Sequence, residues 1–155
     1  MIVARLILVT ITQSAIFVIV MGAILVFDGT SASPEFPRMA ISLWCAILFG
    51  TSVGLINATL FEIVPSWQNI WTILNRPIFF MSCIFYMFES MPLNLQGFLW
   101  WNPLVHIIGL MRTGVYSAQY EGAYISLVYI ATIILTLATI AIATLRSSNK
   151  FIINN

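Results

Sequence analysis

Long apolar segments without charged residues constrain this chain more than any other feature of its sequence. The first, from Leu6 to Phe27, contains no Asp, Glu, Lys or Arg. Crossing the hydrocarbon core of a bilayer takes roughly 20 helical residues, and a helix satisfies its own backbone hydrogen bonds there. Charged residues make up only 7% of the chain, against about 25% in a soluble domain. The sequence therefore predicts an all-α integral membrane protein.

Four segments have the length and hydrophobicity of membrane-spanning helices, and they predict a single membrane domain over residues 1–155. The third is the weakest, because its uninterrupted part, Pro77 to Phe88, is too short to cross alone. Arg76 then stands at one end of that span, from which its side chain can reach the headgroups. The expected spans cover about residues 5–27, 39–61, 70–88 and 122–145.

The second span carries two features that indicate contacts with other helices. Gly50 and Gly54 enclose the sequence GTSVG, a spacing of small residues that lets another helix approach closely. The motif alone is a weak sign of a dimer, since glycine is frequent in membrane helices. Asn57 is a costly polar group in the same span, so we expect it to have a partner inside the protein.

An aromatic, proline-broken stretch from Trp100 to Tyr120 departs from the pattern of spans. Asn102 is a preferred cap for a helix N-terminus, and Pro103 suits the first helical position because its missing N–H costs nothing there. We therefore expect a short apolar helix before Asn102 and a new helix over about residues 103–117. Neither is long enough to cross a bilayer. The stretch predicts a re-entrant helical hairpin, at about residues 92–118, before the last span.

Helical spacing divides the second helix of this hairpin into an apolar face and a polar face. We expect the polar face to meet water or hydroxyl-rich ligands. It consists of His106, Gly109, Thr113, Ser117 and Tyr120. Simpler roles remain open for single residues. Trp100 and Trp101 also fit as anchors at the membrane interface. His106 also fits as a hydrogen-bonded structural histidine, and Arg112 as a side chain that reaches lipid headgroups.

The distribution of basic residues predicts the orientation in the membrane. Four complete spans place both termini on one side. With both termini in the cytoplasm, four of the six basic residues lie inside, which fits the excess of Lys and Arg in cytoplasmic loops. The inside group is Arg5, Arg76, Arg146 and Lys150, and the outside group is Arg38 and Arg112. The hairpin then enters the bilayer from the outer face.

Patterns of catalysis and cofactor binding are missing from the sequence. It has no phosphate-binding loop, and its only lysine, Lys150, lies in the polar C-terminal tail. His106 is alone, and Cys45 and Cys83 fit as small buried apolar residues, so neither a metal site nor a disulfide is indicated. A net charge of +1 offers no basic surface for nucleic acid. These observations favour a passive membrane component that is not an enzyme, has no cofactor of its own and receives energy from elsewhere.

Two neighbouring blocks resemble the permease subunits of bacterial ABC-2 type exporters, in particular the capsular polysaccharide export permeases. They read NRPIFFMSCIFYMFESMP (residues 75–92) and LWWNPLVHIIGLMRTGVYSAQY (residues 99–120). The resemblance implies a homodimer among the lipids of the bacterial inner membrane. Each permease subunit would pair with a separate cytoplasmic ATPase subunit, and together they would export a lipid-linked polysaccharide.

The same resemblance places the hairpin near the outer end of the translocation channel, where aromatic residues line the path. The tryptophan and tyrosine rings would stack against sugars. Asn102, Pro103 and His106 would shape the turn and its polar lining, and Arg112 would meet an anionic polymer or a lipid phosphate. The candidate residues of the translocation path are Trp100, Trp101, Asn102, Pro103, His106, Arg112, Tyr116 and Tyr120.

Two departures from the family pattern keep alternatives open. Family members usually begin with an amphipathic helix, two further spans and a cytoplasmic helix that grips the ATPase, whereas Met1 stands just before the family's third span. A truncated, non-transporting membrane fragment is therefore one alternative, and an ABC-2 permease for another lipid-linked polymer or a small amphiphile is another. In addition, family members often have an acidic residue where Gly109 stands, so Arg112 is expected to lack that nearby partner.

Overall fold

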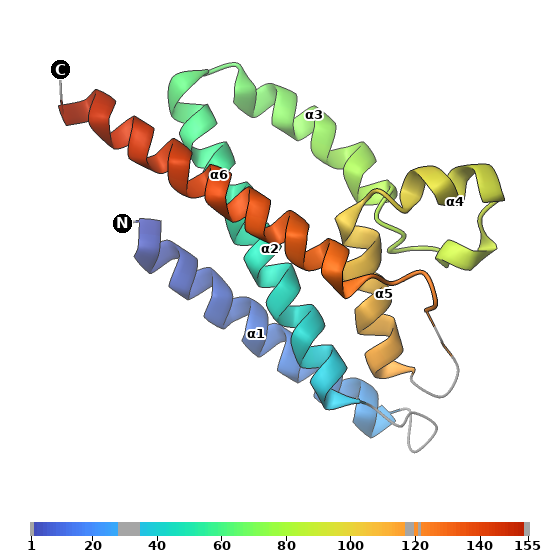
Figure 1. Ribbon diagram of the computed structural model, residues 1–155. Helices are drawn as coiled ribbons and strands as arrows, with labels where there is room; N and C mark the ends of the chain where they lie inside the picture. Colours follow the sequence, from blue (N-terminus) through green and yellow to red (C-terminus); the bar gives the residue numbers. More distant parts are fainter. Residues whose placement is uncertain (1, 28–34, 117–119, 121, 154–155) are drawn as a thin grey trace.

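The computed structural model describes residues 2–27, 35–116, 120 and 122–153, with only the backbone described at residues 2–6, 24–27 and 147–153. Within these ranges every regular element is a helix, in agreement with the predicted all-α class (Figure 1). The elements are α1 (Ile2–Phe27), α2 (Phe36–Ile63), α3 (Trp67–Phe80), the 3-10 helix η1 (Phe88–Ser90), α4 (Leu93–Leu99), α5 (Pro103–Val115) and α6 (Leu127–Ile153).

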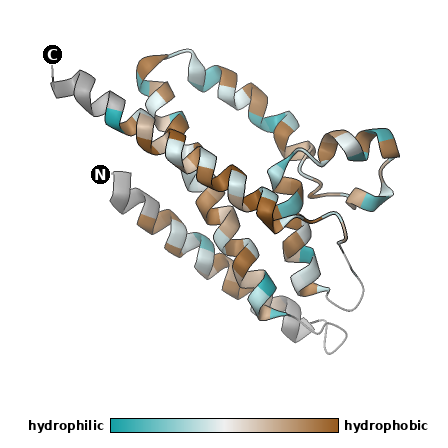
Figure 2. Ribbon diagram, viewed as in Figure 1, coloured by the Kyte–Doolittle hydropathy of each residue, from teal (hydrophilic) through white to brown (hydrophobic). Residues whose placement is uncertain are grey.

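Among the residues whose side chains the structure describes, two helices, α2 and α6, are long and apolar enough to cross a membrane. α2 has 28 residues, and the described apolar part of α6, residues 127–146, has 20. At a rise of about 1.5 Å per residue, 20 residues extend about 30 Å, which is the thickness of the hydrocarbon core. Figure 2 shows hydrophobic residues along most of both helices. Only 17% of the most apolar part of each is buried inside the structure, so both present wide apolar surfaces outward.

The centre of the molecule lies where α2, α5 and α6 meet. Ile107 of α5 packs against Ile130 and Ile134 of α6. Cys45 and Phe49 of α2 close the cluster from the third side. Residues far apart in the sequence thus form one small apolar core.

α5 also lies close against the start of α2. The Ser42 hydroxyl donates to the Ile107 carbonyl at 2.7 Å, and the Glu35 N–H donates to the Gly114 carbonyl at 2.8 Å. A Cβ at Gly114 would lie 2.6 Å from Met39 Cγ and 3.0 Å from the Met39 nitrogen. Glycine at this position therefore permits the close approach of the two helices.

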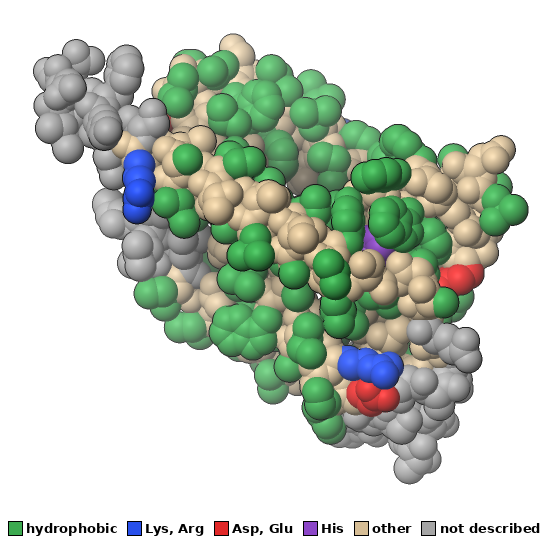
Figure 3. All heavy atoms as spheres, in the orientation of Figure 1, with side chains coloured by type: hydrophobic (Ala, Val, Ile, Leu, Met, Phe, Trp, Pro, Cys, Tyr) green, Lys and Arg blue, Asp and Glu red, His purple; other side chains and the backbone are tan. Residues whose placement is uncertain are grey.

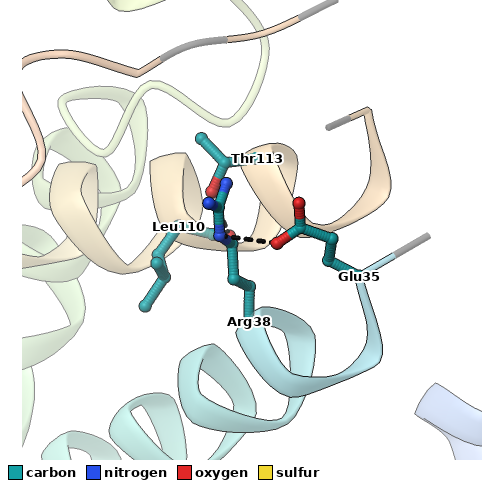
Figure 4. Close-up of polar contacts among 4 residues, drawn as sticks. All are labelled: Glu35, Arg38, Leu110 and Thr113. Atoms are coloured by element: carbon teal, nitrogen blue, oxygen red, sulfur yellow. Dashed lines mark hydrogen bonds and ion pairs between the residues drawn. The ribbon is translucent and has the colours of Figure 1, made fainter. Parts of the chain in front are cut away.

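An exposed ion pair marks the same junction. Arg38 Nε lies 2.7 Å from Glu35 Oε2. Figure 4 shows the Arg38 side chain between Glu35 and the part of α5 that carries Leu110 and Thr113. Because the two charged side chains are 49% and 45% exposed, the pair contributes at most about 1 kcal/mol. The junction depends mainly on the buried contacts between α2 and α5.

α1 and α3 lie outside this centre (Figure 1). A groove of about 630 Å³ lies between α1 and α2. α3 is anchored at its start, where the Trp67 indole N–H donates to Asn57 Oδ1 at 2.9 Å. Asn57 is buried, and its amide also donates to the Val53 carbonyl at 3.1 Å, which confirms the expected internal partner. At Gly50 and Gly54, no described atom outside their own helix lies within 4 Å of an added Cβ, so this surface is open in the chain.

The third predicted span differs from the structure. A helix is expected over about residues 70–88, but α3 ends at Phe80 after 14 residues, a length of about 21 Å. The Ser82 hydroxyl then donates back to the Phe79 carbonyl at 2.6 Å. Cys83 has a φ of 59°, which no right-handed helix contains. Contacts from the distant hairpin, described below, hold this turn, and an apolar run gives no sign of them.

The last helix begins later than the expected span. The sequence places its start near residue 122, whereas α6 begins at Leu127. Gly122 has a φ of 57°, in the left-handed region that favours glycine. A Cβ there would lie 2.7 Å from Thr113 Cγ2, because residues 122–126 fold back against α5. The start of the expected span is therefore a turn that covers the hairpin.

Candidate functional site

The hairpin is built from α4 and α5, joined by a turn at residues 100–102. The Leu104 N–H donates to the Asn102 side chain at 3.0 Å, and Pro103 is the first residue of α5. These contacts confirm the predicted cap and helix start, and a cap of this kind stabilises by about 1 kcal/mol. The Asn102 amide also donates to the Met81 carbonyl at 3.1 Å, which ties the hairpin to the turn after α3.

Trp100 and His106 lie in an aromatic cluster with Tyr124 and Tyr129. His106 is fully buried. Its Nδ1 accepts from the Ser126 N–H at 3.3 Å, so Nε2 carries the proton and donates to the Trp100 carbonyl at 2.8 Å. The Trp100 ring lies 5.2 Å from the His106 ring and 5.1 Å from the Tyr129 ring, centroid to centroid. These contacts support the structural role left open for this histidine.

The same cluster fixes the hairpin turn to the start of α6. The Tyr129 hydroxyl donates to the Trp101 carbonyl at 2.6 Å, and the Trp100 indole N–H donates to the Tyr124 carbonyl at 3.2 Å. The Tyr124 ring also stacks on Phe88 with 4.1 Å between centroids. Parts of η1, the hairpin turn, the segment before α6 and the start of α6 therefore pack as one unit.

In its described part, the polar face of α5 is buried, contrary to the expectation from sequence. The buried members are His106, Gly109 and Thr113, and Ser117 lies outside the described residues. Residues 122–126 cover this face: a Cβ at Gly109 would lie 3.0 Å from Tyr124 Cζ and would clash with the Tyr124 hydroxyl. The expectation of an open face is wrong here because it treats the covering residues as part of the last span.

Trp101 is the exposed member of the tryptophan pair, with 69% of its surface accessible. Together with Asn102 and Pro103 it lines a groove of about 580 Å³. The other side of the groove belongs to α2 and α3 and includes Trp71 and Asn75. The groove thus offers indole rings and amides beside a largely apolar surface.

The remaining candidates meet in a pocket of about 430 Å³. It is lined by Phe85, Tyr86, Met87, Arg112, Tyr116 and Tyr120. Arg112 Nη1 donates to the Tyr86 carbonyl at 3.0 Å, and Nη2 donates to the Cys83 and Ile84 carbonyls at 2.8 Å each. Three backbone carbonyls therefore take the place of the acidic partner missing at Gly109. Because carbonyls carry no net charge, they leave the guanidinium its positive charge, and the Glu89 carboxylate beside Tyr120 brings a negative charge close to the same pocket.

Two tyrosines bring hydroxyl groups to this pocket. Tyr116 is 48% exposed. The Tyr120 hydroxyl donates to Glu89 Oε2 at 3.1 Å and lies 3.0 Å from the Tyr124 hydroxyl. Burial, and then the hydrogen bond to Glu89, raise the pKa of Tyr120, so its phenol stays protonated and can donate.

The eight candidate residues divide among three places. Trp100 and His106 belong to the buried cluster, Trp101, Asn102 and Pro103 to the groove, and Arg112, Tyr116 and Tyr120 to the pocket. Three further residues around these places, Tyr86, Glu89 and Tyr124, are not evident from sequence, because the pattern assigns them to spans or span ends. The one available signal is the shortness of the apolar run after Pro77, which argues against a continuous third span.

Apolar side chains dominate the surface around these places. Figure 3 shows the charged side chains of one face near its margins. Among the residues that the structure describes, no group of three or more His, Cys, Asp or Glu side chains could hold a metal ion. The groove and the pocket offer aromatic rings, hydroxyls and a guanidinium for non-covalent contacts.

The family of the chain follows from its sequence match. A model of the ABC-2 type transporter family matches residues 1–116, about three quarters of the chain. The chain belongs to the ABC-2 type transporter family. This ABC-2 match includes the whole block at residues 75–92 and confirms the resemblance seen in the sequence.

Two relatives of this ABC-2 protein are polysialic acid transport proteins KpsM of Escherichia coli. They are 29% and 28% identical to it over 149 residues. The aligned region covers 96% of this chain and 57% of each relative, so the chain spans a little over half the length of these relatives.

Proposed function

We propose that this chain is a permease component of an ABC exporter that moves capsular-type, cell-surface polysaccharide across the bacterial inner membrane. The observation that carries the proposal is the similarity to two polysialic acid transport proteins over 96% of the chain. In this proposal the permease is a homodimer among membrane lipids, and both termini of each subunit face the cytoplasm. A separate cytoplasmic subunit hydrolyses ATP, and a lipid-linked polysaccharide is the substrate.

The pocket around Arg112 is suited to an anionic, hydroxyl-rich polymer. The guanidinium offers one positive charge to carboxylate or phosphate groups, beside the negative charge of Glu89. The exposed Tyr116 hydroxyl can exchange hydrogen bonds with sugar hydroxyls. Phe85 and Tyr86 add aromatic rings to the same wall. These features support contact with an acidic polysaccharide.

The groove beside the hairpin turn adds a second surface to the proposed path. Trp101 exposes its indole ring there, and an indole can stack on the apolar face of a sugar. Trp100 and His106 are buried and hold the turn that presents this ring. The exposed candidates thus contact the polymer in this proposal, and the buried ones set their positions.

The proposal is tested by deleting the gene in its own bacterium and measuring polysaccharide at the cell surface and inside the cell. We expect surface polysaccharide to disappear and to accumulate inside, and the reintroduced gene to reverse both changes. Inactivating the phosphate-binding loop of the cognate ATPase subunit is the matched control and should give the same phenotype. Unchanged surface polysaccharide would exclude the proposed function.

The same experiment separates the alternatives. Loss of a different surface glycolipid or amphiphile would assign the chain to another ABC-2 substrate. A non-transporting fragment would leave every surface lipid unchanged, and it would not copurify with the ATPase subunit.

A further inference from the structure

The guanidinium of Arg112 binds a turn that lies far from it in the sequence. Its three acceptors are the carbonyls of Cys83, Ile84 and Tyr86, at 2.8, 2.8 and 3.0 Å. These residues belong to the non-helical segment between α3 and η1. Arg112 thus links α5 to a turn 26 to 29 residues earlier in the chain.

This turn depends on its neighbours for its shape. Cys83 has a φ of 59°, a left-handed conformation that residues with a side chain rarely adopt. Its side chain is 1% exposed and packs with Phe88, Leu99 and Val105. Apolar packing from η1, α4 and α5 therefore holds the thiol, while Arg112 holds the carbonyls.

The same turn forms one wall of the pocket. Phe85, Tyr86 and Met87 lie on that side, and Tyr116 and Tyr120 on the other. We propose that Arg112 is a positioning residue, whose guanidinium holds this wall and so sets the width of the pocket, and that it does not need to bind the transported polymer itself. This inference rests on the proposed transport function and deepens it.

The chemistry of the guanidinium separates this role from that of a simple charge. It presents five N–H donors in a rigid planar fork, and the three carbonyl bonds use both of its terminal nitrogens. A lysine keeps the positive charge but has one nitrogen on a flexible stem, so it cannot bind all three carbonyls in this geometry. Arg112→Lys therefore removes the positioning and preserves the potential of the pocket.

The test uses the two cysteines of the chain. In a Cys45→Ala background, Cys83 is the remaining thiol, and its rate of reaction with a small maleimide reports whether the turn stays packed against η1, α4 and α5. We compare the otherwise unchanged chain, Arg112→Lys and Arg38→Lys in membranes, and we measure surface polysaccharide in the same strains. Arg38→Lys is the matched control, because it makes the same substitution at an arginine that pairs with Glu35 at the α2–α5 junction.

We expect Cys83 to react slowly in the unchanged chain and in Arg38→Lys. In Arg112→Lys it should react at least about tenfold faster, because the turn loses two or more hydrogen bonds. Surface polysaccharide should fall in Arg112→Lys and stay unchanged in Arg38→Lys.

Other results overturn the inference. A protected Cys83 in Arg112→Lys would show that the wall keeps its shape without the fork. Faster labelling with unchanged export would show that the wall does not matter for transport. If Arg112→Lys does not fold, Arg112→Gln, which keeps two N–H donors, replaces it, and failure of both to fold would overturn a role confined to the wall. The labelling reaction does not require transport. If the unsubstituted chain exports no polysaccharide, that result refutes the proposed function, while the labelling rates still test the role of Arg112.

Discussion

At Gly109, the lack of a side chain lets the segment before α6 lie against α5. The Tyr124 ring fills the space beside it, and a Cβ would stand 3.0 Å from Tyr124 Cζ and 3.2 Å from Ile125 Cδ1. The same ring stacks on Phe88. Gly109 therefore permits the close packing of residues 122–126 against α5.

Gly109→Ala should lower the free energy of unfolding by about 1–3 kcal/mol, because the added methyl group displaces the Tyr124 ring from a packed position. The measurement is thermal unfolding of the purified chain in detergent. Gly97→Ala in α4 is the matched control, since nothing lies within 4 Å of a Cβ there, and alanine favours a helix by up to about 1 kcal/mol over glycine. Equal effects of the two substitutions would contradict the packing described at Gly109.

His106→Ala should cost about 3 kcal/mol or more, because it leaves the Trp100 carbonyl and the Ser126 N–H without partners and opens a buried cavity. Tryptophan fluorescence during unfolding is a suitable measurement, since the Trp100 ring lies 5.2 Å from the His106 ring. Thr132→Ala, at an exposed site on α6, serves as the control and should stay within about 0.5 kcal/mol. A similarly small effect at His106 would argue against its structural role.

At the scale of the elements, the start of α5 and the end of α3 are determined by different kinds of contact. The start of α5 depends on Asn102 and Pro103 alone, so it could be predicted from the sequence. The end of α3 depends on the Asn102 amide and the Arg112 guanidinium, which reach carbonyls 21 to 29 residues away along the chain. Such long-range contacts leave no periodic pattern. This is why the apolar run over about residues 70–88 indicates a longer helix than α3.

Asn57→Leu should loosen the junction between α2 and α3. The Trp67 indole N–H loses its acceptor, which costs about 1 kcal/mol or more, and we expect faster proteolysis at residues 64–66. Asn75→Leu changes an exposed asparagine on α3 in the same way and is the control. Equal proteolysis of both variants would show that the hydrogen bond between Asn57 and Trp67 does not hold this junction.

In the whole molecule, the hairpin could be predicted from the sequence, but the exposure of its residues could not. The hairpin and its aromatic residues are evident from the sequence, because prolines and polar residues interrupt the apolar pattern there. Whether His106 or Tyr116 is open depends on how residues 122–126 fold over α5, and that packing is a property of the tertiary structure.

α1 begins and α6 ends at the same end of the molecule, away from the hairpin (Figure 1).

The predicted orientation can be tested with single cysteines in a Cys45→Ala, Cys83→Ala background. We expect Tyr116→Cys, at a position 48% exposed, to react with an impermeant maleimide added outside intact cells. Arg146→Cys, at the exposed far end of α6, should react only after the cells are permeabilised. The reverse pattern would place the hairpin in the cytoplasm and refute the predicted topology.

The bonds between the hairpin turn and the start of α6 have a mechanical consequence. Tyr129 holds Trp101, and Ser126 holds His106, while Ser42 ties α5 to α2. We therefore expect α6 and the hairpin to move together if α6 tilts. Within the described part of the chain, α1 and α3 have fewer contacts with α5 and α6 than α2 has, so we expect them to move relative to the hairpin and α6.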